Sequence, residues 1–188
     1  KLYPQRLLES LPGVGQDSAA VYHAFIGDIQ RFPSIGAFLG WTGMIPFSSQ
    51  SGESQAKGLH LTQAGPDPIK RMAYLDANVA RRYDPQLAAL YYDQMVNKGK
   101  HHLQAVCACA SHLLNRVYVL LREQRPYELR DPQGNPLTKK QARQLCKEHY
   151  SVPEEVRQRN NHRVRKQRTE EHLERWTQRQ EEKQKSKG

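Results

Sequence analysis

A serine–glycine pair, Ser51-Gly52, lies in a stretch of the chain that has no sustained hydrophobic periodicity. That stretch covers residues 42–66 and is rich in Gly, Ser, Thr and Gln, and an irregular segment of this length is more often functional than idle. A serine that attacks a phosphodiester needs an exposed hydroxyl, nearby cations and a backbone that admits the substrate. Gly52 gives that access, so the pair predicts phosphoryl transfer through Ser51, with an ordinary loop serine as the alternative. The cations that could serve this serine are Lys57, Lys70 and Arg71.

A glycine-rich turn near the N-terminus could hold a phosphate. Residues 8–15 read Leu-Glu-Ser-Leu-Pro-Gly-Val-Gly and stand between two stretches of helical periodicity. In a helix-hairpin-helix turn, backbone N–H groups lie beside the N-terminus of the second helix and suit a phosphate oxygen. Such contacts position a nucleic-acid backbone without reading its bases. We therefore expect Gly13, Val14 and Gly15 to contact phosphate, and an ordinary helix end followed by a turn is the alternative.

The charge of the chain favours a polyanionic partner. Among 188 residues, 29 are Lys or Arg and 19 are Asp or Glu, a formal net charge of +10. Nucleic acid is the first candidate and an anionic membrane surface the second, while a basic protein with no specific partner is also compatible with this balance. Residues 157–188 hold eleven Lys/Arg and five Asp/Glu with few large apolar groups, so we expect a solvated helix or a disordered extension there.

Membrane insertion, a disulfide framework and a metal site are not expected. No apolar run approaches the ~20 residues of a membrane span, and the N-terminus lacks the layout of a signal peptide. Three cysteines favour a reducing cytosol. Cys107 and Cys109 are two residues apart, which on a helix turns them about 200° from each other. They are better explained as core cysteines than as metal ligands.

The spacing of apolar residues predicts an all-α fold. Within it, the second helix carries Val21, Tyr22, Phe25 and Ile26. The longest helix carries an apolar series that begins at Leu103, and it forms a plausible core with the two helices before it. We divide the chain into a compact helical domain over residues 1–130, a turn and short helix over 131–156, and a basic extension over 157–188. The predicted helices cover residues 3–11, about 16–26, 34–41, 67–82, 84–98, 101–123 and 138–149, where Ser34, Asp67, Asp84 and Thr138 can act as N-caps.

An ordered set of motifs along residues 8–121 resembles a known family. The chain is similar to the C-terminal transposase domain of the IS-one-ten group of bridge-RNA-guided insertion-sequence transposases. Single elements of the set are common, but the ordered set is specific. The matching elements are Leu11-Pro12-Gly13-Val14-Gly15, Gly27-Asp28, Arg31-Phe32, Gly43-Met44-Ile45-Pro46, Ser51-Gly52, Gly65, Ile69-Lys70, Ala77, Asp84-Pro85, Tyr91-Tyr92, Lys98-Gly99-Lys100 and Ala105.

The resemblance implies a site-specific DNA recombinase in which Ser51 is the nucleophile and forms a phosphoserine link to a cut strand. It also implies a guide (bridge) RNA, a homo-oligomer, and a RuvC-like acidic domain, in the same or another chain, that holds Mg²⁺. We expect no cofactor in this chain itself and a cytoplasmic, nucleoid-associated location in a bacterium or archaeon. The predicted nucleic-acid contacts are Gly13, Val14, Gly15, Gln50, Gly52, Lys57, Lys70, Arg71, Arg82, Lys98 and Lys100.

Two departures from the family pattern lie just after the loop that contains Ser51. The usual Gly-Asn reads Gly65-Pro66, and the usual arginine four residues later reads Lys70, with Arg71 beside it. Lysine keeps the charge but lacks the bidentate fork of arginine. The sequence also shows no acidic cluster with the spacing of magnesium ligands, so we expect an excised domain, one chain of a split protein, or a relic. The rival function is a non-catalytic helix-hairpin-helix module that binds nucleic acid.

Overall fold

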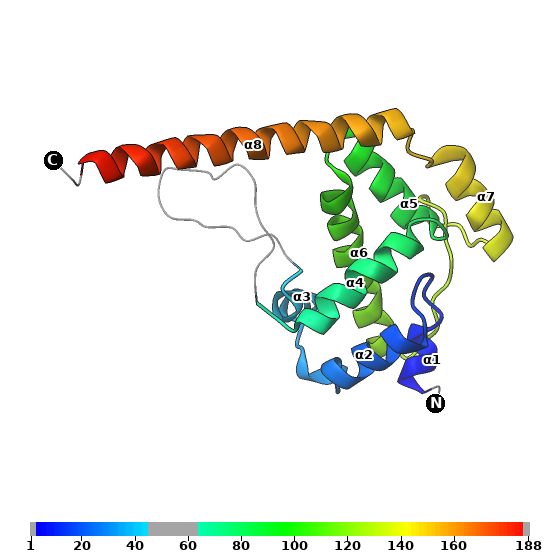
Figure 1. The fold of residues 1–188 in the computed structure, drawn as a ribbon. Coiled ribbons are helices and arrows are strands. Elements are labelled where there is room, and N and C mark those ends of the chain that lie inside the picture. Colours follow the sequence, from blue (N-terminus) through cyan, green and yellow to red (C-terminus); the bar gives the residue numbers. More distant parts are fainter. Residues whose placement is uncertain (1–2, 45–63, 186–188) are drawn as a thin grey trace.

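The fold is a bundle of helices joined by turns, and the computed structural model describes residues 3–44 and 64–185 (Figure 1). A 3₁₀ turn covers Ile29–Arg31, and a π-helical segment, η2, covers Asp93–Asn97. All regular elements of the described residues are helical, so the prediction of an all-α fold is confirmed. The helices are α1 (Pro4–Leu8), α2 (Gln16–Ile26), α3 (Ile35–Thr42), α4 (Asp67–Ala80), α5 (Pro85–Tyr92), α6 (His102–Glu123), α7 (Lys139–His149) and α8 (Glu154–Lys185).

Helix α6 forms the centre of the bundle. Its apolar residues recur every three or four positions, so a broad stripe of its surface packs on α4, α5, α1 and α3. An aromatic cluster closes the α3 side of this core, where the ring centroids of Phe38 and Tyr118 lie 5.6 Å apart. The buried residues of α6 are Ala105, Val106, Cys109, Ala110, Leu113, Leu114, Val117, Tyr118, Leu120 and Leu121.

Three of the four expected N-caps are confirmed. The Ser34 side chain accepts from the Ala37 N–H, the Asp84 side chain from two N–H groups of α5, and Thr138 forms a capping box with Gln141. Each cap satisfies a backbone donor that the helix itself leaves unpaired. Asp67 was predicted as a cap, but Pro66 occupies that position and Asp67 is the first residue of α4.

Two large apolar residues of the predicted helices are exposed. Phe25 is 43% exposed and Leu103 is 48% exposed, because each lies at the solvent edge of its helix. The first helix is also shorter than predicted and ends at Leu8, although Leu11 is still buried. The π-helical segment after α5 was not predicted.

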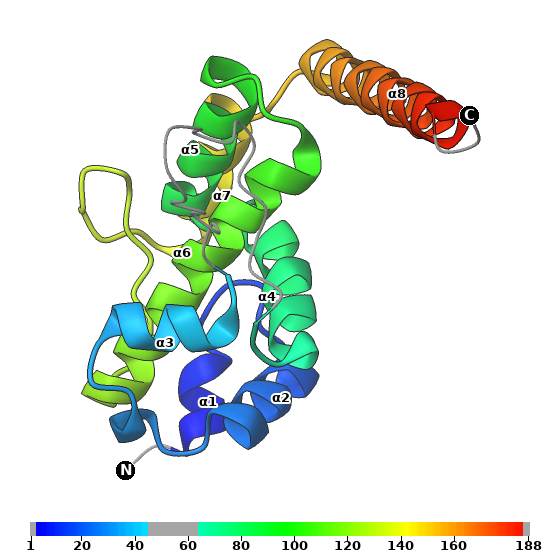
Figure 2. The same cartoon turned by 90° about the vertical axis from the view of Figure 1, so that its left-hand side faces the viewer.

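Helix α8 extends away from the bundle. Its first turns contact η2 and α6, and its C-terminal part projects beyond the other helices (Figures 1 and 2). Asn160 fixes the near end, since its buried Nδ2 donates to the carbonyls of Met95 (2.8 Å) and Lys100 (3.1 Å). A solvated helix or a disordered extension is expected for residues 157–188, and the described part of this range is helical.

Candidate nucleic-acid interface

The glycine turn packs tightly on α4. Gly13 has a φ of +89°, and a Cβ added to it would lie 2.4 Å from the Asp76 carbonyl and 2.8 Å from the Ala80 nitrogen. Val14 is buried. Glycine is therefore required at position 13 by its backbone conformation and by its contact with α4.

Gly15 is the part of this turn that faces solvent. It is the N-cap of α2, and a Cβ placed there would meet nothing within 4 Å. The first turn of α2 carries Asp17, and the hollow beside it is lined by Arg6, Glu9 and Asp17 among others. Two carboxylates and one cation make a weakly attractive setting for phosphate, so phosphate binding at the hairpin stays a prediction.

A buried carboxylate joins α2 to α4 directly behind the glycine turn. Asp76 accepts hydrogen bonds from Ser18 Oγ (2.7 Å) and from the Tyr22 hydroxyl (2.8 Å). Burial raises the pKa of Asp76, and the two hydrogen bonds oppose that rise. This pairing fixes the angle between α2 and α4, and it was not anticipated because Ser18 and Asp76 are 58 residues apart.

The described residues on either side of the segment that contains Ser51 are held by close contacts. Gly65 has a φ of +83°, and a Cβ added to it would lie 2.3 Å from the Trp41 carbonyl. Gly65 therefore touches the end of α3. Before the loop, the Met44 carbonyl accepts a hydrogen bond from Ser111 Oγ on α6. The predicted residues Gln50, Ser51, Gly52 and Lys57 lie outside the described residues.

Lys70 and Arg71 lie on α4 close to the end of this loop. Lys70 Nζ forms an ion pair with Asp67 (2.8 Å) and donates to the Ala64 carbonyl (3.2 Å), so Lys70 helps to fasten the chain where α4 begins. Arg71 is exposed. The expectation that both could serve the loop with charge remains a prediction, and Lys70 also has a structural role.

Arg82 lies at the opposite end of α4. At about 1.5 Å per residue, the helix separates Arg71 and Arg82 by roughly 15 Å, so the two belong to different parts of the surface. Arg82 borders a hollow between α4, α7 and α8. Four further cations line the same hollow, and none of them is among the predicted nucleic-acid contacts: Arg81, Arg143, Lys147 and Arg157.

Lys98 and Lys100 flank a turn beneath α8. Lys98 Nζ forms an ion pair with Asp93 (2.7 Å), and Lys100 is exposed. Between them, the Gly99 carbonyl accepts a hydrogen bond from Arg163 of α8. The predicted contacts are thus spread over several faces, and the first turns of α8 connect the Lys98–Lys100 turn with the hollow beside Arg82.

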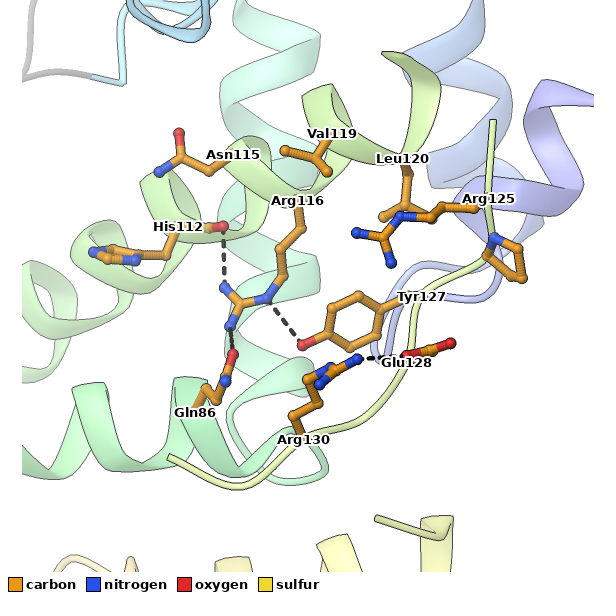
Figure 3. Close-up of a pocket in the computed structure, with 11 residues that line it drawn as sticks. Gln86, His112, Asn115, Arg116, Val119, Leu120, Arg125, Tyr127, Glu128 and Arg130 are labelled. Carbon is orange, nitrogen blue, oxygen red and sulfur yellow. Dashed lines mark hydrogen bonds and ion pairs between the residues drawn. The ribbon is translucent and has the colours of Figure 1, made fainter. Parts of the chain in front are cut away.

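A second hollow, of about 290 Å³, lies between α6 and the segment that follows it (Figure 3). Arg116 is already engaged there: its Nε donates to the Tyr127 hydroxyl (3.0 Å) and its NH2 group to Gln86 Oε1 (3.0 Å). The Tyr127 hydroxyl donates to the buried Asp84 carboxylate (2.6 Å), and burial together with Asp84 raises the pKa of Tyr127. This network fastens residues 124–137 to the core, so its charged groups are largely satisfied by one another.

The cysteines and carboxylates do not form a metal site in the described part of the chain. Within residues 3–44 and 64–185, no three His, Cys, Asp or Glu side chains are placed to hold a metal ion. Burial raises the pKa of both Cys109 and Cys146 to about 12, so these thiols stay protonated at neutral pH. Cys109 is buried as expected, and Cys107 is only half-buried. In the described ranges, no helix is long and apolar enough to span a bilayer.

Comparison with known proteins shows which family model part of this chain matches. Residues 5–92 match the family model described as Transposase IS116/IS110/IS902 family. A Streptomyces coelicolor protein named "Insertion element IS110 uncharacterized 43.6 kDa protein" is 34% identical over 128 residues, which are 68% of this chain and 31% of the relative. These matches support the IS110 group of transposases. Helices α2 to α5 and all of α1 except its first residue, Pro4, fall within the range of the family match.

Two further relatives are similar to this chain. "Insertion element IS900 uncharacterized 42 kDa protein" of Mycobacterium paratuberculosis is 33% identical over 122 residues, 64% of this chain and 30% of that protein. The "Pilin gene-inverting protein" of Moraxella lacunata is 26% identical over 128 residues, 68% of this chain and 40% of that protein. The chain therefore spans about a third of the length of its insertion-element relatives of the IS110 group.

Proposed function

We propose that this chain is the DNA-handling part of a site-specific recombinase that moves insertion elements, with Ser51 as its nucleophile. The main support is the family match over residues 5–92, which includes position 51 within an ordered set of motifs. The relative whose name describes inversion of a pilin gene adds support for recombination of DNA. The chain spans only part of the length of these relatives. The activity of the complete recombinase, to which this chain would contribute, is therefore also proposed.

The chemistry is an exchange of phosphodiester bonds. Ser51 Oγ attacks a backbone phosphorus and forms a phosphoserine bond as it loses its proton. The bond from phosphorus to one deoxyribose oxygen breaks, and that oxygen leaves as a hydroxyl after taking up a proton. Attack by a hydroxyl of a new strand then reverses these steps and releases Ser51, so strands are rejoined without net hydrolysis.

The described residues contribute positioning to this proposal. Gly65 and Met44 fix the two ends of the segment that carries Ser51, and Lys70 fastens the start of α4 beside it. Among the described residues, no three His, Cys, Asp or Glu side chains are placed to hold a metal ion. We propose that a RuvC-like acidic domain holds Mg²⁺, that a bridge RNA selects sites, and that several copies assemble, all within a bacterial or archaeal cytoplasm.

Contacts to nucleic acid are proposed at the positions that the sequence indicates. They include the turn of Gly13, Val14 and Gly15, of which Gly15 is exposed at the start of α2. The remaining proposed contacts are Gln50, Gly52, Lys57, Lys70, Arg71, Arg82, Lys98 and Lys100.

A serine substitution tests this function. The reaction is assembled from the chain, an acidic RuvC-like domain, bridge RNA, and donor and target DNA. We expect Ser51→Ala to abolish strand exchange while DNA binding is unchanged, and the matched control Ser54→Ala to retain both. Recombination that survives Ser51→Ala would contradict the nucleophile, and Ser48, Ser49 or Ser54 would replace it.

The rival function is a nucleic-acid-binding module without catalysis. The hollow beside Arg82 favours it, because that surface could bind a backbone without any reaction. The two functions differ in one result: a module alone gives the same outcome for Ser51→Ala and for Ser54→Ala.

A further inference from the structure

The hollow between the end of α4, α7 and the start of α8 is lined by an unusual concentration of positive charge. It has a volume of about 330 Å³, and no carboxylate is among its lining residues. Tyr83 and Tyr150 supply aromatic surface beside the charges. We call it the basic hollow, and its five cations are Arg81, Arg82, Arg143, Lys147 and Arg157.

Two of these cations, Arg81 and Arg143, are held by contacts with uncharged groups. Arg81 Nε donates to Asn78 Oδ1 (2.9 Å), and its guanidinium lies 4.2 Å from the centroid of the Tyr91 ring. Arg143 lies 5.6 Å from the centroid of the Tyr83 ring. An amide and two aromatic rings orient these groups without neutralising them.

The positive charge is poorly compensated within the described protein. Among the described residues, no ion pair joins Arg81, Arg82, Arg143 or Lys147 to a carboxylate. Arg157 has one ion pair, at 3.4 Å, with Glu154, whose side chain is 63% exposed, and such surface pairs are weak.

Two further observations describe how closely the positive groups of the basic hollow are held together. The Nε of Arg157 is buried, and no group of the described residues forms a hydrogen bond with it. A buried N–H without a protein partner is rare in folded proteins, and an ordered water or an ion can satisfy it. Burial, and then the neighbouring Arg82 and Arg157, lower the pKa of Arg81, as expected where like charges are held together.

Positive charge continues from the basic hollow along α8. Residues 157–169 hold six Lys or Arg and no Asp or Glu, whereas residues 170–188 hold five of each. The excess charge of the C-terminal extension therefore lies entirely in the turns that start at the hollow. The glycine turn differs, because its adjoining hollow contains Glu9 and Asp17 with a single cation.

We propose that the basic hollow binds backbone phosphates of nucleic acid and that the first half of α8 continues this track. Arginine suits the role because its planar fork bonds two phosphate oxygens at once. The identity of the partner as nucleic acid rests on the proposed function, but the site itself does not involve Ser51. Two of its walls, α7 and α8, lie outside the residues of the family match.

Paired substitutions on one helix test this site. Arg143→Gln with Lys147→Gln removes two charges from the basic hollow, and Lys139→Gln with Lys140→Gln removes two exposed charges of α7 that do not line it. Binding of the 188-residue chain to a dye-labelled DNA duplex and to single-stranded RNA is measured by fluorescence anisotropy across salt concentrations.

The readout is the slope of log affinity against log salt. For two lost phosphate contacts, the Arg143/Lys147 variant should flatten the slope by about 1.8 on duplex DNA and by about 1.4 on single-stranded RNA. A change on only one of these probes identifies that nucleic acid as the ligand of the hollow. The Lys139/Lys140 control should keep the wild-type slope on both.

Three results overturn the proposal. Equal slopes for the two variants on both probes exclude the hollow as a phosphate site, and Ser51 chemistry would be unaffected. Binding of a labelled polyglutamate peptide is measured in the same way. If the Arg143/Lys147 variant loses affinity for this peptide alone, the hollow is a site for acidic protein instead. If the Arg143/Lys147 variant does not fold, as judged by circular dichroism, Arg82→Gln with Lys147→Gln is measured against the same control, and an unchanged slope there overturns the proposal equally.

Discussion

Substitution of Gly13 by alanine separates two roles of the glycine turn. The change forces a side chain into a backbone at φ +89°, with its Cβ 2.4 Å from the Asp76 carbonyl. The left-handed conformation costs alanine about 1–2 kcal/mol, and relief of an overpacked contact typically costs about 1–3 kcal/mol. We therefore expect Gly13→Ala to lower the free energy of unfolding by about 2–5 kcal/mol, which for a chain of this size lowers Tm by roughly 4–20 °C.

The assay is thermal and urea unfolding, with Gly40→Ala as the matched control. Gly40 lies within α3, and a Cβ added there would meet nothing within 4 Å. Alanine at such a helical position should raise the free energy of unfolding by about 0.5–1 kcal/mol. If Gly13→Ala instead kept its full stability and lost only DNA affinity, the role of Gly13 would be phosphate access, and our account of its packing on α4 would be refuted.

Three further predictions concern stability and charge. The pKa of Asp76 is raised in the folded state, so the folded protein binds this proton more tightly than the unfolded chain does. Protonation of Asp76 therefore stabilises the fold fully below about pH 4, and this stabilisation is lost as pH rises through the raised pKa. Urea unfolding of the wild type relative to Asp76→Asn should show this decline, and parallel pH curves would contradict it. Tyr127→Phe removes a donor to the buried Asp84 carboxylate and should cost about 1–3 kcal/mol in urea unfolding, so an unchanged midpoint would count against the network. Deletion of residues 170–188 removes no net charge and should leave the salt slope of DNA binding unchanged, whereas a strongly flattened slope would place the nucleic-acid track at the far end of α8.

The helical fold could be predicted because its determinants are local. Ser34, Asp84 and Thr138 each stand directly before a helix and satisfy its first N–H groups, and this chemistry is visible in a few adjacent residues. The stripe along α6 is equally local. The exposure of Phe25 and Leu103 could not be predicted, because periodicity gives the face of a helix and not how much of that face its neighbours cover.

The candidate sites could be predicted only in part, because they depend on contacts distant in sequence. The turn at Gly13 was recognised, but its packing on α4 could not be foreseen from the turn alone. The basic hollow joins Arg82 to Arg143 and Arg157, and no spacing rule brings residues of α4, α7 and α8 together. The role of Ser51 still rests on its motif, since the residue lies outside the described ranges.

The most direct test of the account is to identify the residue that becomes linked to DNA. The assembled reaction is stopped during strand exchange, the DNA is digested to a nucleotide stub, and the labelled peptide is sequenced by mass spectrometry. We predict a phosphoserine-linked nucleotide at Ser51. A nucleotide on Ser48, Ser49 or Ser54, or completed strand exchange with no protein-linked nucleotide at any stage, would contradict the proposed mechanism.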